Sequence, residues 1–290
     1  MNHANFSVIL IIPSASYRTN PFMDAATKLD INILVITDKS QVFSEYYPDN
    51  VITMNFEHWQ ESIENIREWS ERYDLKAVIG VDEESIILAA KLSESLCIEH
   101  NSLESVKLTK NKYLMRSELK KSGLKSPWFK RFSVHETPKD IFAELSFPCV
   151  LKPTFLSASQ GVLRVNSFEE FGKGCEMLSD LLAEEKVKKR GGDQANWILV
   201  EEYIPGKEVS IEGIVNDGKL KDLAIFDKPE PLEGPIFPET IFITPTILDE
   251  HLQSSLLETA QTALQALGIS KGPVHIELRI NDHGNYILEC

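Results

Sequence analysis

Apolar runs separated by helical segments constrain the fold of the first hundred residues more than any other feature. The runs Phe6–Ile12, Ile31–Ile36 and Ala77–Val81 are short and almost wholly apolar. Helical patterns lie between and after them, including Glu57–Arg72 and Glu83–Leu96. Strands buried on both faces carry such continuous apolar runs, and an intervening helix makes successive strands parallel. The pattern therefore predicts βαβ units and a parallel sheet.

This part of the chain, residues 1–105, looks like a Rossmann-like lobe. The loop after its first strand reads Pro13-Ser14-Ala15-Ser16 and lacks the glycines of a GxGxxG turn. Those glycines let the backbone approach a pyrophosphate, so the loop does not indicate a dinucleotide site.

The pattern becomes antiparallel in the rest of the chain. Asn216-Asp217-Gly218 and Asp282-His283-Gly284 are hairpin-turn sequences, and Gly268 ends a long helix over Leu248–Leu267. We expect a small helix–strand lobe over 106–203 and a larger antiparallel lobe over 204–290, so the fold class is α/β plus α+β. The other expected elements are helices over 21–29, 109–122, 138–145 and 167–184, strands over 128–134, 149–152, 162–165 and 198–203, and a surface loop over 186–194.

Charge and cysteine usage exclude several classes of function. The formal net charge is −14, which repels nucleic acid and anionic membranes. Four cysteines, Cys97, Cys149, Cys175 and Cys290, are far apart and lack metal-ligand spacing. No run approaches the roughly 20 apolar residues of a membrane span. These features predict a reduced, cytoplasmic protein whose main partners are neither nucleic acid nor membranes; a homodimer is compatible with them.

Four local motifs follow one another in the rest of the chain. They span Asn111–Arg116, Pro148–Val162, Val200–Glu208 and His275–Glu289. Taken in order, they resemble the ATP-grasp superfamily from about residue 107 to the end, and the preceding lobe resembles that family's N-terminal domain. The resemblance implies two α+β lobes with ATP between them. It also implies a ligase that joins a carboxylate to an amine through an acyl phosphate.

The first two motifs supply candidate phosphate-binding residues. By the resemblance, Lys112 and Lys152 lie near the phosphates of ATP, where an ammonium offsets negative charge. The alternative is that both are solvated surface lysines. The loop with Ser157, Ser159 and Gly161 matches the one that folds over the triphosphate. It has fewer glycines than the family usually shows, and the alternative is an ordinary hairpin loop.

The third motif supplies candidate adenine- and ribose-binding residues. By the resemblance, Glu201 faces the adenine amino group, and the segment Glu202, Tyr203 and Ile204 contacts the base edge. Glu208 matches the acid that accepts from the ribose hydroxyls, since one carboxylate can accept from two donors. The alternative is that these glutamates are solvent-facing acids.

The fourth motif supplies candidate metal ligands. Residues on strand 274–280 alternate, so His275, Glu277 and Arg279 share one face. By the resemblance, Glu277 and Glu289 bind Mg²⁺, or Mn²⁺ in its place, and the ion holds ATP phosphates. His275 and Arg279 are then candidate catalytic residues. The alternative is a salt-bridge network between the glutamates and Arg279.

The end of the sequence departs from the family. The family continues beyond its second metal-binding Glu with an Asn and then an Arg, whereas this sequence ends at Cys290. We expect a shortened form of a longer polypeptide, or a site completed by another segment. This 290-residue form is then expected to bind ATP without turnover.

The substrates are less defined. The expected carboxylate and amine are an amino acid or a similar small metabolite. Glu230, Glu233 and Glu239 would border the acceptor region and hint at an amino-bearing substrate. Two alternatives stay open: a bicarbonate-using enzyme of the biotin carboxylase or carbamoyl phosphate synthase kind, and an ATP-binding module without turnover.

Overall fold

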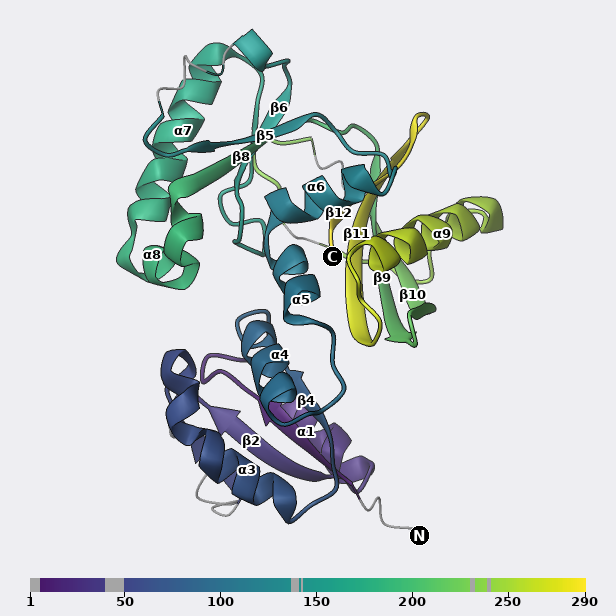
Figure 1. The fold of residues 1–290 in the computed structure, drawn as a ribbon. Helices are drawn as coiled ribbons and strands as arrows, with labels where there is room; N and C mark the ends of the chain where they lie inside the picture. The colour runs from purple at the N-terminus through teal and green to yellow at the C-terminus, as the bar shows by residue number, and fades with distance from the viewer. Residues whose placement is uncertain (1–5, 40–49, 137–140, 142, 230–232, 239–240) are drawn as a thin grey trace. The chain divides into compact units, whose positions relative to one another are not determined.

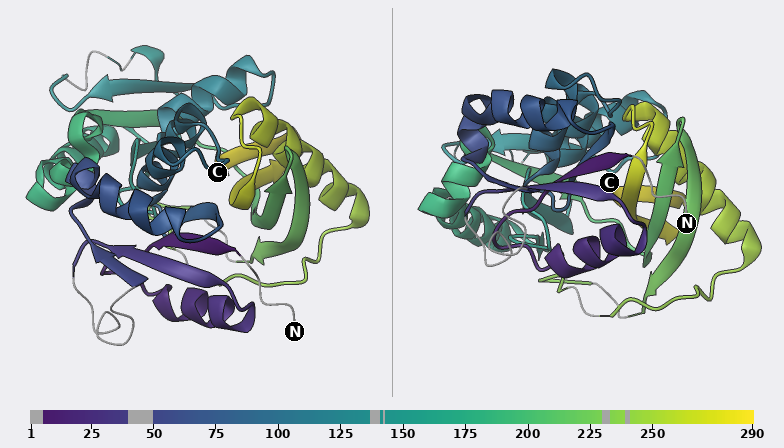
Figure 2. Two further views of the ribbon diagram at one scale, coloured as in Figure 1. Left: turned by 60° about the horizontal axis from the view of Figure 1, so that its bottom comes forward. Right: turned by 90° about the horizontal axis from the view of Figure 1, so that it is seen from below.

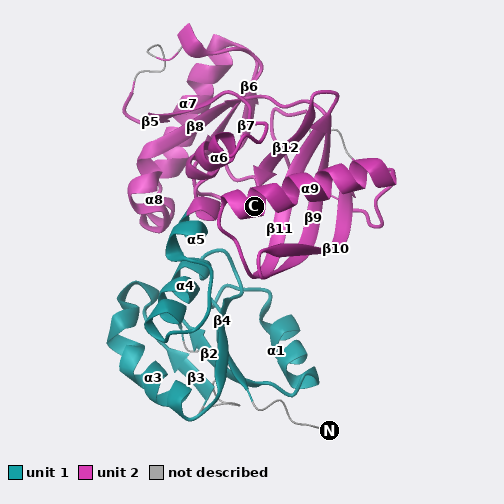
Figure 3. Ribbon diagram, turned by 45° about the vertical axis from the view of Figure 1, so that its right-hand side comes forward, with its two compact units in different colours: residues 1–107 teal, residues 108–290 magenta. Residues whose placement is uncertain are grey.

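A computed structural model describes the chain except for residues 1–5, 40–49, 137–140, 142, 230–232 and 239–240. The chain forms two compact units, residues 1–107 and residues 108–290 (Figure 3). Half of the helix expected over 138–145 lies outside the described residues, and so do Glu230 and Glu239.

The first unit is built on a four-stranded parallel sheet with the strand order β3-β2-β1-β4, of which β2 and β4 are labelled in Figure 1. This is the order of half a doubly wound sheet, so the Rossmann-like prediction is confirmed. β3 was not predicted, because three residues give too short a pattern. The strands are β1 (Ser7–Ile11), β2 (Asn32–Thr37), β3 (Val51–Thr53) and β4 (Leu75–Gly80).

Both faces of this sheet are buried, which explains its continuous apolar strands. Ile9 and Ile11 of β1 face one core with α3 (Ile63–Glu71) and α4 (Ile86–Ser95). Their neighbours Val8 and Leu10 face a second core with α1 (Thr19–Lys28). The helical stretch expected over 57–72 is confirmed, but it consists of two elements, the 3₁₀ segment η2 (Phe56–Ser62) and α3.

The second unit begins near a helix break that the sequence did not reveal. The helix expected over 109–122 is confirmed as α6 (Lys112–Lys121), but its expected start at Thr109 is wrong, because that residue belongs to a separate helix, α5 (Leu103–Lys110). Asn111 between them has extended backbone angles, and its side chain accepts hydrogen bonds from the N–H groups of Tyr113 and Leu114. This is an N-cap, which makes Lys112 the first residue of α6.

The first antiparallel sheet of this unit has the order β5-β8-β6-β7. Helix α7 (Phe168–Ala183) begins at its predicted cap, Ser167, and covers one face. The buried residues between them include Phe132, Leu151 and Phe171. The strands are β5 (Phe129–Ser133), β6 (Cys149–Pro153), β7 (Leu163–Val165) and β8 (Trp197–Glu202).

The surface loop expected over 186–194 is wrong. Helix α8 (Glu185–Gly191) and the 3₁₀ segment η4 (Gly192–Asn196) occupy this stretch. Val187 packs against the core, and a side chain at Gly191 would collide with the Phe155 ring. Packing of one apolar side chain and one glycine therefore orders a segment whose charges suggest a loop.

The second antiparallel sheet has the order β10-β9-β11-β12, and α9 (Glu250–Ala266) packs on one face (Figure 2). Ile276 and Leu278 point into that core, as the alternation in the sequence predicts. The intervening residues, among them Glu277 and Arg279, point to the other face. The strands are β9 (Lys207–Asn216), β10 (Lys219–Lys228), β11 (Gly272–Asn281) and β12 (Gly284–Glu289).

Within the described residues, every helix falls short of the length and apolar character that crossing a bilayer requires. The four cysteines are free thiols.

Replacing Asn111 by alanine should destabilise the protein by roughly 1–2 kcal/mol, because the two N–H groups at the start of α6 lose their acceptor. Denaturation in urea measures this. The matched control is Asn196→Ala at an exposed position in η4, which should change stability little. Equal stabilities of the two variants would contradict the cap.

Candidate active site

A cavity of about 70 Å³ lies in the second unit, lined by strands of both antiparallel sheets. Strands β6 and β8 contribute from one sheet, and β9, β11 and β12 contribute from the other. Ten of the residues singled out from the sequence line it, which brings together three of the four motifs. They are Lys152, Ser159, Glu201, Glu202, Tyr203, Ile204, Glu208, Glu277, Arg279 and Glu289.

Glu201 is the most buried carboxylate of this cavity, with 3% of its surface exposed. One of its oxygens accepts from Nε of Arg116 at 3.0 Å, and the other contacts the Lys152 ammonium. Burial alone would raise the pKa of Glu201, but the charges of Arg116 and Lys152 outweigh it and hold the pKa at about 2. Glu201 is therefore an anion that fixes two cations, and both of its oxygens are engaged.

Lys152 and Lys112 are both held by contacts with buried or partly buried groups. Burial lowers the pKa of Lys152, and the neighbouring charge of Glu201 opposes that shift. The Lys112 ammonium donates to the carbonyl of Leu156 at 2.6 Å and pairs with Glu289 at 2.9 Å. Both lysines are less than 10% exposed, so the alternative of solvated surface lysines is excluded.

A second ion-pair cluster surrounds Glu208. Its oxygens accept from Lys228 at 2.8 Å and from Nε of Arg279 at 2.9 Å. Lys228 also pairs with Glu277 at 2.5 Å. Burial would lower the pKa of Lys228, but Glu277 and Glu208 outweigh it and raise the pKa. The Lys228 ammonium therefore joins Glu208, which was expected at the ribose, to Glu277, which was expected at the metal.

Arg279 is oriented by contacts on several sides. Its NH1 donates to the carbonyl of Ile204 at 2.7 Å. The guanidinium lies 5.2 Å from the ring centroid of Tyr203 and 5.6 Å from that of Phe237. These contacts hold Arg279 against Glu208. Arg279 can therefore position the Glu208 carboxylate.

Glu277 and Glu289 are direct partners in the register of β11 and β12. Like charges that face each other across a strand pair repel, so each needs a counter-charge. Lys228 supplies it to Glu277, and Lys112 supplies it to Glu289. Burial would raise the pKa of Glu277, but neighbours including His275 and Lys228 hold it at about 2. Two ionised carboxylates side by side are suitable ligands for a hard divalent cation.

His275 lies outside the cavity lining. Its Nδ1 is 2.6 Å from Glu212, and its Nε2 is 3.5 Å from Glu277. Hydrogen bonding to Glu212 and Glu277 raises the pKa of His275 to about 10. The imidazole is therefore protonated at neutral pH and contributes positive charge beside Glu277.

The loop between β6 and β7 contributes less than the sequence suggests. Ser159 lines the cavity, whereas the hydroxyl of Ser157 accepts from Arg190 of α8 at 3.4 Å. Gly161 lies against Leu178 and Leu181 of α7, where its positive φ and lack of a side chain are both required. Neither Ser157 nor Gly161 lines the cavity.

Buried side chains of both charges are concentrated in this region. Five basic side chains here are at most 9% exposed, and four carboxylates pair with them. The hydroxyl of Thr154, next to β6, is buried and makes no hydrogen bond within the described residues. Five buried cations and an unused hydroxyl fit an anionic, oxygen-rich ligand. The cations are Lys112, Arg116, Lys152, Lys228 and Arg279, and the carboxylates are Glu201, Glu208, Glu277 and Glu289.

Two of these cations carried no role in the sequence analysis. Arg116 is 1% exposed and links Glu201 to the carbonyl of Ile287 in β12. Its spacing of four residues from Lys112 puts both on one helix face, which is the signal that could have found it. Lys228 is paired in register with Glu208, but that register is not readable from the sequence.

Comparison with known proteins decides the family. A model described as ATP-grasp domain matches residues 145–290, which is half of the chain. The chain belongs to the ATP-grasp family. This agrees with the resemblance of the four motifs.

Three relatives show how far the similarity to other ATP-grasp proteins extends. Alanine–anticapsin ligase of Bacillus subtilis (strain 168) is 27% identical over 291 residues, covering 95% of this chain and 61% of the relative. The L-amino acid ligase structure from Bacillus licheniformis superposes with a TM-score of 0.80 at 24% identity, covering 98% and 68%. An ADP complex of purK, N5-carboxyaminoimidazole ribonucleotide synthetase, gives 0.72 at 19%, covering 100% and 71%. The α/β plus α+β fold is confirmed, and the chain spans about three fifths of the length of the curated relative.

Glu201→Gln should destabilise this ATP-grasp chain by roughly 3–5 kcal/mol at pH 7, since Arg116 and Lys152 lose a buried counter-charge. Because the folded pKa is depressed to about 2, the stabilisation is present above about pH 4.5 and is lost as pH falls toward 2. The deficit of the variant should therefore shrink over that window.

Urea denaturation at pH 7, 4.5 and 3 measures this deficit. The matched control is Glu169→Gln, which changes an exposed ion pair on α7 and should leave stability nearly unchanged. A pH-independent deficit for Glu201→Gln would contradict an ionised Glu201.

Proposed function

We propose that this chain carries the ATP site of a ligase that joins a carboxylate to an amine through an acyl phosphate. The observation that carries the proposal is the cluster of five buried cations and four carboxylates in a chain of net charge −14. Local cations are required to draw a polyphosphate into a protein whose overall field repels it. The similarity to alanine–anticapsin ligase supports an amino acid as one substrate.

Phosphate binding is the proposed role of Lys112 and Lys152. Both ammonium groups are held in place, one by Leu156 and Glu289 and the other by Glu201. Such preorganised charge stabilises a phosphoryl group in transfer without reorganisation during the reaction. The hydroxyls of Thr154 and Ser159 are further donors on the same side, since one is unsatisfied and the other lines the cavity.

Adenosine binding is the proposed role of the segment that follows β8. Glu202, Tyr203 and Ile204 line the cavity and lead to Glu208, the proposed acceptor from the ribose hydroxyls. Glu201 holds Lys152 and Arg116 in place, because both of its oxygens are engaged by these two cations. Arg279 positions Glu208, and Ser157 and Gly161 shape the loop beside the phosphates.

Divalent metal binding is the proposed role of Glu277 and Glu289. Mg²⁺, or Mn²⁺, would neutralise the two facing carboxylates and link them to the phosphates. Lys228 and Lys112 now provide that neutralisation, so both ammonium groups become available for phosphate oxygens when the metal is bound. His275 adds positive charge beside Glu277.

Several broader properties belong to the same proposal. The two sheets of the second unit form the two lobes, 106–203 and 204–290, that enclose the nucleotide. The partners are small-molecule substrates, and the protein works in the cytoplasm. Glu233, the described member of the three acids near the acceptor region, is exposed.

Nucleotide binding to Lys152→Met should be weaker by about tenfold or more, because a charge-assisted contact worth about 1.5–3 kcal/mol is lost. Methionine keeps the side-chain length and removes the charge. Calorimetric titration with ATP and Mg²⁺ measures the affinity, and circular dichroism checks the fold. Lys173→Met, on the surface of α7, is the matched control and should bind ATP normally. Unchanged affinity in a folded Lys152→Met protein would exclude this site.

Substrate class is tested by ADP formation from ATP and Mg²⁺, first with pooled amino acids and then with bicarbonate. We expect release of ADP and phosphate only in the amino acid arm, together with a product whose mass equals the two substrates minus water. Release that depends on bicarbonate would favour a carboxylating enzyme. ATP binding without ADP in either arm would favour a binding module and contradict the ligase.

A further inference from the structure

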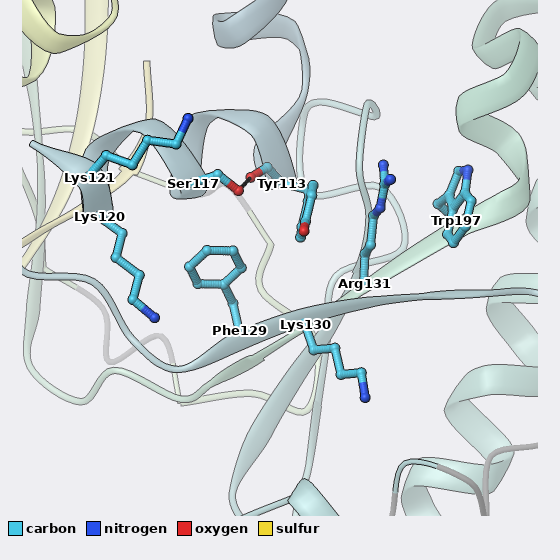
Figure 4. A pocket seen from close by; sticks show the side chains of 8 residues that line it. All are labelled: Tyr113, Ser117, Lys120, Lys121, Phe129, Lys130, Arg131 and Trp197. Atoms are coloured by element: carbon cyan, nitrogen blue, oxygen red, sulfur yellow. Dashed lines mark hydrogen bonds between the residues drawn. The ribbon is translucent and has the colours of Figure 1, made fainter.

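A second, larger cavity of about 580 Å³ lies in the same unit, beside α6 and β5 (Figure 4). It shares no lining residue with the candidate active site. Its size falls within the range of small-molecule sites, roughly 300–1,000 Å³. It is lined by Tyr113, Ser117, Lys120 and Lys121 of α6, Phe129, Lys130 and Arg131 of β5, and Trp197 of β8.

The charge of this cavity is opposite to that of the chain. Four basic residues line it and no carboxylate does, although the chain carries a net charge of −14. Lys121 pairs with Glu118, and Lys130 pairs with Glu144. Within the described residues, Arg131 has no ion pair and no side-chain hydrogen bond.

Arg131 is held by aromatic rings on both faces. Its guanidinium carbon lies 4.6 Å from the ring centroid of Tyr113 and 4.4 Å from that of Trp197 (Figure 4). Cation–π stacking restrains the planar group and leaves the N–H donors along its edge for a ligand. A guanidinium fixed in this way loses little further freedom when it binds an oxyanion bidentately.

The remaining lining supplies apolar surface beside the charge. Lys120 lies over the Phe129 ring at 5.7 Å, so a second ammonium and an aromatic face lie together. Tyr113, Ser117 and Lys120 follow the i, i+4, i+7 spacing and form one face of α6. The neighbouring face of the same helix carries Lys112 and Arg116, which belong to the candidate active site.

We propose that this cavity binds a small metabolite that carries an oxyanion, a carboxylate or a phosphate, beside an aromatic or apolar group. Arg131 takes the oxyanion with help from Lys120, and the rings of Phe129 and Trp197 contact the apolar part. A long polyanion such as single-stranded nucleic acid is disfavoured by the net charge of the chain. Because the ligand contacts α6, it is an effector in a position to change how Lys112 and Arg116 are held.

Two matched probes separate the sources of the oxyanion. Phenyl phosphate and phenylacetate carry the same ring with different acids, and benzyl alcohol is their neutral counterpart. Calorimetric titration of the full chain should show binding of at least one acid about tenfold tighter than benzyl alcohol. Preference for phenyl phosphate identifies a phosphate-bearing ligand, and preference for phenylacetate identifies a carboxylate. No binding of either acid would overturn the proposal.

Variants locate the binding in this cavity. Arg131→Gln should weaken binding of the preferred acid by about tenfold or more, and Arg131→Lys should weaken it less, because the charge stays while the planar fork is lost. Lys120→Gln should also weaken it, which keeps the test decisive if Arg131→Gln does not fold. Lys173→Gln, on the surface of α7, is the matched control and should bind normally. Unchanged binding in folded Arg131→Gln, or tighter binding of an oligothymidylate than of phenyl phosphate, would each overturn the proposal.

Discussion

The candidate active site depends on the buried carboxylate of Glu201 and the cations around it. An ionised carboxylate with 3% of its surface exposed is tolerated only when opposite charges and hydrogen bonds surround it. Arg116 reaches it from α6, and Lys152 reaches it from β6. Arg116 also donates to the carbonyl of Ile287 in β12, so one buried network joins α6 to both antiparallel sheets.

The same network explains why the cavity is small in this structure. At about 70 Å³ it is far below the roughly 300 Å³ at the lower end of small-molecule sites. Lysines and glutamates neutralise one another across it, as Lys228 does for Glu208 and Glu277. Entry of a nucleotide with its metal requires exchange of these ion pairs for phosphate and metal contacts.

Local sequence patterns were sufficient for the framework and for many members of the site. Alternation along strand 274–280 assigned Ile276 and Leu278 to the core and Glu277 to the opposite face, because the side-chain period of a strand is two. The helix break at Asn111 was not readable, since helical spacing continues on both sides of it. Helix α8 was missed because its order comes from contacts of Val187 and Gly191 with a distant core.

Ion-pair partners were the least predictable feature. Lys112 and Glu289 are far apart in the sequence and meet only because α6 and β12 lie together in the fold. Lys228 was overlooked for the same reason, since its role comes from the register of β10 with β9. Glu201 was assigned to adenine from its position in a motif, but the motif does not show that Arg116 and Lys152 occupy both oxygens. Motifs in the sequence identified the functional residues, whereas the ion pairs that connect them depend on the tertiary structure.

A crystal structure of this chain with a non-hydrolysable ATP analogue and Mg²⁺ tests the central claim most directly. We predict phosphate oxygens within hydrogen-bond distance of Lys112 and Lys152, and the ribose hydroxyls at Glu208. We also predict the metal at Glu277 and Glu289, with Lys228 released from at least one of its two glutamates. A nucleotide bound elsewhere, with the ion pairs of Glu201, Glu208 and Glu277 unchanged, would contradict the account.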